Sequence, residues 1–151
     1  MKKVSLLLVF LLAMAGTAMA AGTNTLTVSA SVTSKCDFTS TTSTLAFGSL
    51  DPATNADATA STTIQAWCTK GVTSTSLSND LGQHASGTTL RMSDGGTNYL
   101  PYTLGLSPAS VTGTGINTPT TITLNGTVAK ADIQGAAAGS YSDTVTLTIN
   151  P

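Results

Sequence analysis

The chain has 151 residues, of which 9% are charged, and its formal net charge at pH 7 is −1. So weak an electrostatic field offers nothing to attract nucleic acid or an acidic membrane surface, and we expect neither as a partner. A chain of this length is typical of one domain with its own hydrophobic core.

The first twenty residues have the pattern of a signal peptide. Lys2 and Lys3 give a positively charged start, residues 4–15 form an apolar stretch, and the Ala-Met-Ala run at 18–20 is a small-residue cleavage site. We therefore predict a signal peptide over residues 1–20 and an exported mature chain. No later segment is comparably apolar, so the mature protein is expected to have no membrane anchor.

The chain has two cysteines, Cys36 and Cys68. In an exported protein an even pair of cysteines most often forms a disulfide, and only one pairing is open here. Closing a loop of about 32 residues stabilises a fold by roughly 3 to 4 kcal/mol in the chain-entropy description. The alternative, half of a metal site, lacks a nearby histidine ligand. We predict a Cys36–Cys68 disulfide and no metal site.

Both ends of the predicted mature chain alternate apolar and hydroxyl side chains with the period of a β-strand. Residues 26–33 and residues 144–149 are therefore predicted to be strands, each with one apolar face. The apolar residues are Leu26, Val28, Ala30 and Val32 near the start, and Val145, Leu147 and Ile149 at the end.

Shorter strand candidates lie between clusters of Gly, Pro, Asn and Asp. They are residues 44–47, 62–69, 75–78, 99–106 and 120–128. No segment after Ala21 carries an apolar stripe at helical spacing, so we expect little helix and an all-β sandwich. The Asn125-Gly126 pair allows two interpretations: a two-residue hairpin turn, or a continuous strand in which Gly126 is a bulge or a point of close approach.

No residue pattern points to catalysis. The single histidine, His84, lies in a polar segment that contains glycine, and a Ser-His-Asp triad requires no fixed spacing. The chain nevertheless has no Gly-x-Ser-x-Gly elbow, no metal-spaced histidines and no phosphate-binding loop. We expect an exposed, structural His84 and a protein that is not an enzyme and needs no cofactor.

The acidic residues and the one tryptophan also have structural interpretations. Asp side chains near turn-forming residues commonly cap turns through backbone amides. The residues in this class are Asp51, Asp57, Asp80, Asp94, Asp132 and Asp143. Trp67, next to Cys68, is expected to pack in the core against the disulfide, and stacking on carbohydrate is the alternative.

Several separated motifs occur in a fixed order along the chain. A Thr-rich alternating segment leads into Cys36, followed by Leu45-Ala46-Phe47-Gly48 with Asp51-Pro52, and by Trp67-Cys68-Thr69-Lys70-Gly71. Further along come Arg91-Met92-Ser93, Leu100-Pro101-Tyr102 and Gly139-Ser140-Tyr141-Ser142-Asp143-Thr144-Val145. Together these motifs resemble the spore coat protein U domain, the Csu-type pilin of archaic chaperone-usher pili, over essentially the whole mature chain.

The resemblance implies an immunoglobulin-like β-sandwich that lacks its last strand, which a periplasmic chaperone and then the N-terminal strand of the next subunit complete. It implies no cofactor, no small-molecule substrate and no catalytic residue. The implied partners are other pilin subunits in a homo-polymer or mixed polymer, a periplasmic chaperone and an outer-membrane usher. The implied location is a cell-surface pilus, or fimbrium, that supports adhesion and biofilm formation.

On this basis residues 21–34 are predicted to be the donor segment and residues 35–151 the pilin domain. The predicted donor side chains are Leu26, Val28, Ala30 and Val32, and the predicted acceptor groove is lined by Val145, Leu147 and Ile149. The chain departs from the family pattern in ending at Asn150-Pro151 rather than on an aromatic residue, and in carrying Gly126-Thr127 where Gly-Arg is usual.

Alternatives remain open at the level of sequence. Only three residues separate Val32 from Cys36, so the donor segment could instead lie earlier, within residues 21–30. The same alternation also suits a segment that folds back onto its own sheet. The rival hypothesis is a monomeric secreted adhesion or coat module that is closed by its own strand and binds a ligand through loops around Trp67 or Tyr99.

Overall fold

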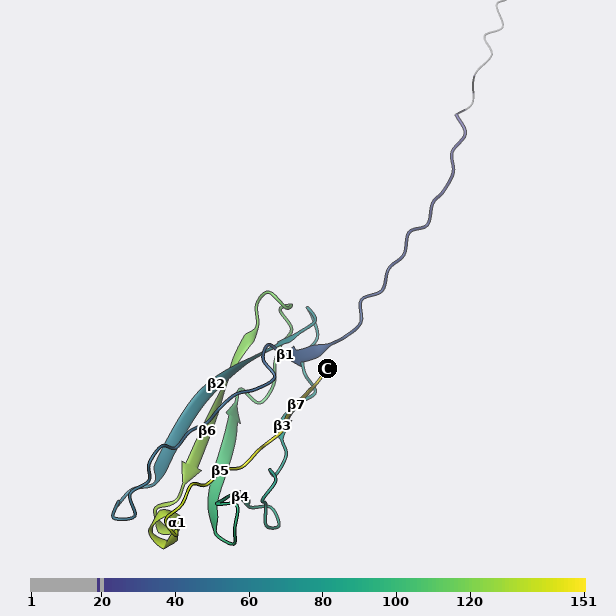
Figure 1. Cartoon of the computed structure of the whole chain (residues 1–151). Helices are drawn as coiled ribbons and strands as arrows, with labels where there is room; N and C mark the ends of the chain where they lie inside the picture. Colours follow the sequence, from purple (N-terminus) through teal and green to yellow (C-terminus); the bar gives the residue numbers. More distant parts are fainter. Residues whose placement is uncertain (1–18, 20) are drawn as a thin grey trace, which may run out of the picture. The chain divides into compact units, whose positions relative to one another are not determined.

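The computed structural model describes Met19 and residues 21–151 (Figure 1). The predicted signal peptide, residues 1–20, lies outside the described residues except for Met19. The chain divides into two units, and the boundary lies between Ser31 and Val32. In the first unit the described residues 21–31 form neither strand nor helix, and their side chains are exposed. Among the described residues, no helix is long and apolar enough to cross a membrane.

The second unit is a folded body built almost entirely of strands, which confirms the all-β prediction. Its elements are β1 (Cys36–Phe38), β2 (Ala58–Cys68), β3 (Ser76–Asn79), β4 (Leu90–Ser93), β5 (Tyr99–Ser107), β6 (Thr120–Val128), α1 (Lys130–Gly135) and β7 (Leu147–Asn150). The helix α1 is a short connection after β6, with Ile133 as its buried residue.

Five strands form one antiparallel sheet in the order β1-β2-β6-β5-β4. Its central pair, β2 and β6, is in register from Ala58 opposite Val128 to Ala66 opposite Thr120. A second antiparallel pair, β3 with β7, packs against the five-stranded sheet through Leu77 and Ile149. This two-layer arrangement is consistent with an immunoglobulin-like sandwich.

Two apolar clusters make up the core. The first surrounds the disulfide and contains the buried residues Cys36, Ala66, Cys68, Val111 and Ile122. The second lies toward α1 and contains the buried residues Leu100, Tyr102, Val128 and Ile133. Tyr141 and Val145 pack against the second cluster and are only partly buried. The last segment of the chain therefore covers the sheet incompletely.

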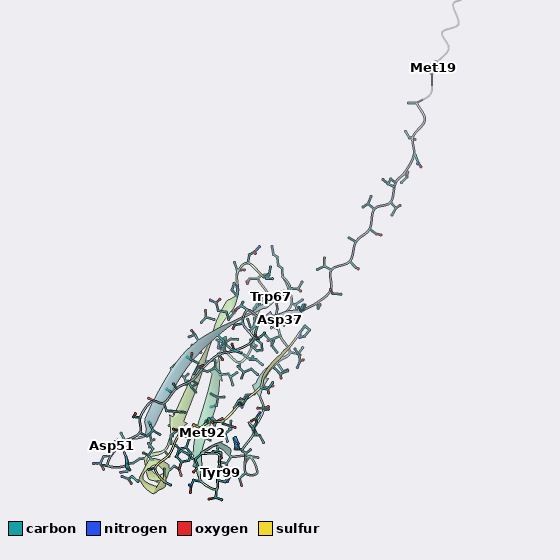
Figure 2. All side chains as sticks on the ribbon, in the orientation of Figure 1. Met19, Asp37, Asp51, Trp67, Met92 and Tyr99 are labelled. Atoms are coloured by element: carbon teal, nitrogen blue, oxygen red, sulfur yellow. A yellow bond between two sulfur atoms is a disulfide. The ribbon has the colours of Figure 1, made fainter. Side chains whose placement is uncertain are left out.

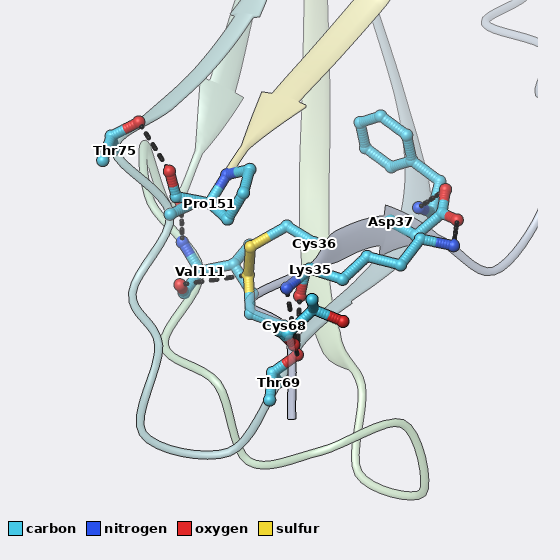
Figure 3. The surroundings of a disulfide bond; sticks show 11 residues. Lys35, Cys36, Asp37, Cys68, Thr69, Thr75, Val111 and Pro151 are labelled. Carbon is cyan, nitrogen blue, oxygen red and sulfur yellow. Dashed lines mark hydrogen bonds and ion pairs between the residues drawn. A yellow bond between two sulfur atoms is a disulfide. The ribbon is translucent and has the colours of Figure 1, made fainter. Parts of the chain in front are cut away.

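The predicted disulfide between Cys36 and Cys68 is present (Figure 3). The two cysteines lie opposite each other in the ladder between β1 and β2, so the bond fixes the edge strand β1 to its neighbour β2. Next to it the Thr69 N–H donates to the Lys35 carbonyl at 2.8 Å, and the Lys35 N–H donates to Thr69 Oγ1 at 3.0 Å. The chain is therefore attached to the end of β2 at residues 35 and 36.

The Asn125-Gly126 pair lies inside the uninterrupted strand β6, so the hairpin interpretation is wrong and the continuous-strand interpretation is confirmed. A Cβ atom at Gly126 would lie 2.7 Å from Leu45 Cδ2 and 2.7 Å from Phe47 Cζ. Glycine is therefore needed at this position because the segment around Leu45 and Phe47 crosses the inner face of β6 at close range.

Gly113 shows a similar constraint imposed by backbone atoms. Its N–H donates to the Val72 carbonyl at 2.6 Å, and a Cβ added to it would collide with the carbonyl oxygens of Thr69 and Val72. We expect Gly113→Ala to lower the free energy of unfolding by roughly 1 to 3 kcal/mol, measured by urea titration, because neither carbonyl can move aside. Gly135→Ala is the control, since its Cβ meets no atom within 4 Å. Equal stability of the two variants would contradict this account of Gly113.

The strand predictions succeed where neighbouring strands supply hydrogen bonds and fail where none does. The segments predicted at 62–69, 75–78, 99–106 and 120–128 correspond to β2, β3, β5 and β6. Residues 26–33 and 44–47 are not strands, and β7 begins at Leu147 rather than at residue 144. In each of these cases the alternating sequence pattern is present, but the backbone ladder that defines a strand is not.

The prediction that Trp67 packs in the core is wrong. Side chains alternate between the two faces along β2, and Ala66 and Cys68 occupy the buried face on either side of Trp67. Trp67, labelled in Figure 2, therefore lies on the opposite face and is partly buried. The ammonium group of Lys35 lies 5.7 Å from its ring centroid.

Candidate strand-accepting groove

A groove of about 970 Å³ lies over the inner face of the five-stranded sheet. It is lined by residues 43–50, by residues between 136 and 147, and by the inward side chains of β5 and β6. All of these residues belong to the folded body. The two long segments have no strand assignment over most of their length and form the two edges of the groove.

Residues 43–50 form the first edge. Leu45 and Phe47 are partly buried, whereas their neighbours Thr44, Ala46 and Gly48 are exposed, which is the alternation of an edge strand. Yet in the described part of the chain no backbone N–H or C=O group of residues 43–50 has a hydrogen-bond partner. The first edge is thus strand-like in its side chains and unpaired in its backbone.

Residues 139–147 form the second edge, which is paired on one side only. The N–H and C=O groups of Ser142 bond to Ser93, and the Thr146 carbonyl accepts from the Asp80 N–H at 2.9 Å. Because backbone groups alternate in direction along a strand, those of residues 143 and 145 point the other way, toward the groove. Within the described residues, neither of these two has a backbone hydrogen-bond partner.

The floor of the groove is apolar. Leu100, Tyr102 and Leu104 of β5 and Leu124 of β6 line it, together with Ile133 of α1. An apolar floor between two unpaired backbone edges is the geometry of a sheet from which one strand is missing. Such a site exposes a template for a further strand, which would gain both a hydrogen-bond ladder and burial of its apolar side chains.

Asp143 is the one charged side chain that faces the core from the second edge, and it is only 2% exposed. Its Oδ2 atom accepts a hydrogen bond from the Tyr102 hydroxyl at 2.8 Å, and its Oδ1 atom accepts one from the Gln83 N–H at 2.9 Å. The His84 ring nitrogen Nδ1 lies 3.0 Å from Oδ1. This carboxylate therefore holds the second edge to β5 and to the loop before β4.

The hydrogen bonds decide the charge state of Asp143. Burial by itself raises the pKa of this carboxyl group, but the hydrogen bonds from Tyr102, the Gln83 N–H and His84 outweigh it, so the pKa lies below the ordinary value of 3.8. The pKa of the Tyr102 phenol shifts in the opposite direction, because burial and the neighbouring carboxylate both raise it. Asp143 is therefore ionised and Tyr102 neutral at physiological pH.

His84 is half-buried rather than exposed, because it is drawn into this network. Its backbone carbonyl also accepts a hydrogen bond from Arg91 Nε at 2.9 Å. The His84–Asp143 pair is two-thirds of a triad, but among the described residues no serine hydroxyl is hydrogen-bonded to the His84 ring. The His84–Asp143 pair attaches the loop before β4 to the second edge.

The structure separates the residues predicted to form the acceptor groove. Val145 and Leu147 line the groove. Ile149 packs instead against the cluster around the disulfide, beyond the end of the groove. The predicted donor residues Leu26, Val28 and Val32 are 82%, 84% and 85% exposed, and Ala30 is exposed as well.

Most of the groove was not identified from the alternation of the last strand. The sequence predicts the first edge only as a short strand at 44–47 and as part of a motif at 45–48, and the floor residues of β5 only as part of a strand. The partial signals were the period-two spacing of Leu45 and Phe47, and the glycine at 126 that permits their approach to β6. Asp143 was predicted to cap a turn, whereas it joins the second edge to Tyr102 of β5 and to the loop before β4. The motif at residues 139–145 contains Asp143 but does not indicate these partners.

The chain was compared with models of known protein families. The model described as "Spore Coat Protein U domain" matches residues 22–148, which is most of the chain and includes both edges of the groove. The search of curated proteins finds no match. Domains of this family are associated with fimbrial subunits of chaperone-usher systems. The chain therefore belongs to the Spore Coat Protein U domain family.

Proposed function

We propose that this protein is a structural subunit of a chaperone-usher surface pilus, and that it polymerises by donor-strand exchange. The observation that carries the proposal is the apolar groove with two unpaired edges in a chain whose N-terminal arm, residues 21–32, is itself unpaired. The arm of one copy would fill the groove of the next. A periplasmic chaperone would fill the groove before assembly, and an outer-membrane usher would carry the polymer to the cell surface, where it supports adhesion and biofilm formation.

The arm and the groove match in length. The apolar residues of the arm extend from Leu26 to Val32, and the inward residues of the second edge extend from Tyr141 to Leu147. Each span covers six residue steps, which is about 20 Å for an extended chain at roughly 3.3 Å per residue. One copy of the arm can therefore lie along the whole second edge.

The gain in free energy from filling the groove is large. Burying three aliphatic side chains contributes roughly 1.5 to 3 kcal/mol each, and the alanine and the backbone ladder add to this before the costs of association are subtracted. A buried charge in the arm would remove most of this gain, because an unpaired carboxylate in an apolar groove is strongly disfavoured.

The proposal predicts opposite results for charges on the two faces of the arm. With chaperone and usher co-expressed, the unmodified chain should form heat-resistant multimers that appear as a ladder on denaturing gels. Val28→Asp should abolish the ladder and leave a chaperone-bound single chain, whereas Thr27→Asp, on the outer face, should leave the ladder unchanged. An undiminished ladder with Val28→Asp would refute the arm as donor.

A further inference from the structure

The floor of the groove is bridged at one point by three side chains in contact. Phe47, from the first edge, packs edge-on against Tyr102, with ring centroids 6.4 Å apart. The Tyr102 hydroxyl donates to Asp143 Oδ2, from the second edge, at 2.8 Å. Tyr102 is 8% exposed and the Asp143 side chain 2%. The Phe47–Tyr102–Asp143 bridge therefore connects the two edges across the floor of the groove.

The polar atoms of the bridge need no hydrogen bond from an incoming strand. Both carboxylate oxygens of Asp143 already accept hydrogen bonds, Oδ1 from Gln83 and His84 and Oδ2 from Tyr102. Adding a large aliphatic side chain above these contacts would displace one of them, whereas a methyl group adds little volume. The position over the bridge therefore favours a small apolar residue.

The other inward positions of the second edge favour large apolar residues. They are Tyr141 on one side of Asp143, and Val145 and Leu147 on the other, and all three are partly buried. Along the second edge, an incoming strand therefore meets four positions in turn. The positions opposite Tyr141, Val145 and Leu147 suit large apolar residues, and the position opposite Asp143 suits a small one. The arm has a single small residue in its apolar series, Ala30, with Val32 after it and Leu26 and Val28 before it.

We infer, on the basis of the proposed function, that Ala30 sets the register of assembly. The arm of a second copy runs antiparallel to residues 141–147 and places Ala30 opposite Asp143, over the Phe47–Tyr102–Asp143 bridge. In this register Leu26 lies opposite Leu147, Val28 opposite Val145 and Val32 opposite Tyr141.

No other alignment of the arm satisfies all four positions. Moving the antiparallel arm by two residues in either direction places a valine opposite Asp143. A parallel arm with Ala30 in the same place sets Ser34 opposite Leu147 and Leu26 opposite Gly139. The antiparallel alignment therefore follows from the order of side-chain sizes in this chain.

Cysteine pairs test the register directly. Opposite residues of a hydrogen-bonded antiparallel pair have Cα atoms about 5.5 Å apart, which suits a disulfide, whereas a displacement by two residues exceeds disulfide reach. The double variant Val28→Cys, Val145→Cys should therefore give multimers linked covalently between copies and separated by a reductant. The double variant Val28→Cys, Leu147→Cys should give multimers without this link.

The outcomes separate the register from the proposed function. If multimers form but the 28–147 pair cross-links in place of the 28–145 pair, the register is wrong and donor-strand exchange survives. If the unmodified chain, expressed with chaperone and usher, forms no multimers, the proposed function fails and the register fails with it.

A size change at Ala30 gives a second, independent test. Ala30→Leu should reduce the yield of multimers roughly tenfold or more, because overpacking at the bridge weakens the contact. Ser29→Leu adds a similar volume at the neighbouring residue, on the outer face of the arm, and should leave the yield near that of the unmodified chain. A normal yield from Ala30→Leu would overturn the assignment of Ala30 to the bridge.

Discussion

Asp143→Ala is expected to lower the free energy of unfolding by roughly 3 to 5 kcal/mol. The substitution removes the acceptor of three hydrogen bonds and leaves the donors of Tyr102 and Gln83 without their partner. An unpaired buried donor costs more than the bond itself contributed, because the group has also lost its hydration. The second edge of the groove would lose its attachment to β5.

Urea titration of the folded chain measures this effect, and Tyr102→Phe is the control. That variant removes one donor and keeps the carboxylate bound to Gln83 and His84, so we expect a loss of only about 1 to 2 kcal/mol. If Asp143→Ala costs no more than Tyr102→Phe, the carboxylate is not the centre of the network.

The network also predicts how stability depends on pH. The pKa of Asp143 in the folded chain lies below the ordinary value of 3.8, so the folded state favours the ionised form. The contribution of Asp143 is therefore complete above that ordinary value and is lost as the pH falls through the lower folded pKa. Unfolding curves between pH 7 and pH 2 should show this loss in the unmodified chain and a weaker one in Asp143→Ala.

Removal of the disulfide is also expected to lower the free energy of unfolding strongly. The cysteines are 32 residues apart, and in the chain-entropy description a crosslink over such a loop contributes roughly 3 to 4 kcal/mol. The bond also holds β1, a strand of three residues, against β2 at the point where the arm leaves the body. The double variant Cys36→Ser, Cys68→Ser should therefore unfold at markedly lower urea concentration.

Reduction of the unmodified chain provides the matching control. Treatment with a thiol reductant breaks the same bond without changing the sequence, so it should lower the stability by a similar amount. If the double serine variant and the reduced chain are both within about 1 kcal/mol of the oxidised protein, the ladder between β1 and β2 is sufficient by itself.

The long, hydrogen-bonded strands of the five-stranded sheet could be predicted from the sequence. β2, β5 and β6 carry long alternating patterns, and each has ladder partners that turn the pattern into a strand. The disulfide could also be predicted, because the chain has only two cysteines and an exported protein usually joins such a pair. β1, β4 and α1 were missed because they are short and carry too few residues to establish a period.

The groove could be predicted only in outline, because its two edges are about one hundred residues apart in the chain. The alternation of Val145 and Leu147 indicated one edge, but nothing in the pattern separates Ile149, which packs beside the disulfide. Trp67 was misplaced because its neighbour Cys68 suggested the core, whereas strand alternation directs adjacent side chains to opposite faces. The bridge from Phe47 to Asp143 joins three segments, and no local pattern shows such a contact.

Hydrogen–deuterium exchange at the two edges of the groove tests the central claim most directly. In single copies separated from the chaperone, for which the Val28→Asp variant serves, the amides of residues 43–50, 143 and 145 should exchange rapidly, while those of β2 and β6 stay protected. In multimers of the unmodified chain, amides on both edges should become protected, because a strand from the next copy bonds to them. Strong protection of these amides in dilute single copies would mean that the chain closes its own sheet, which would contradict the account.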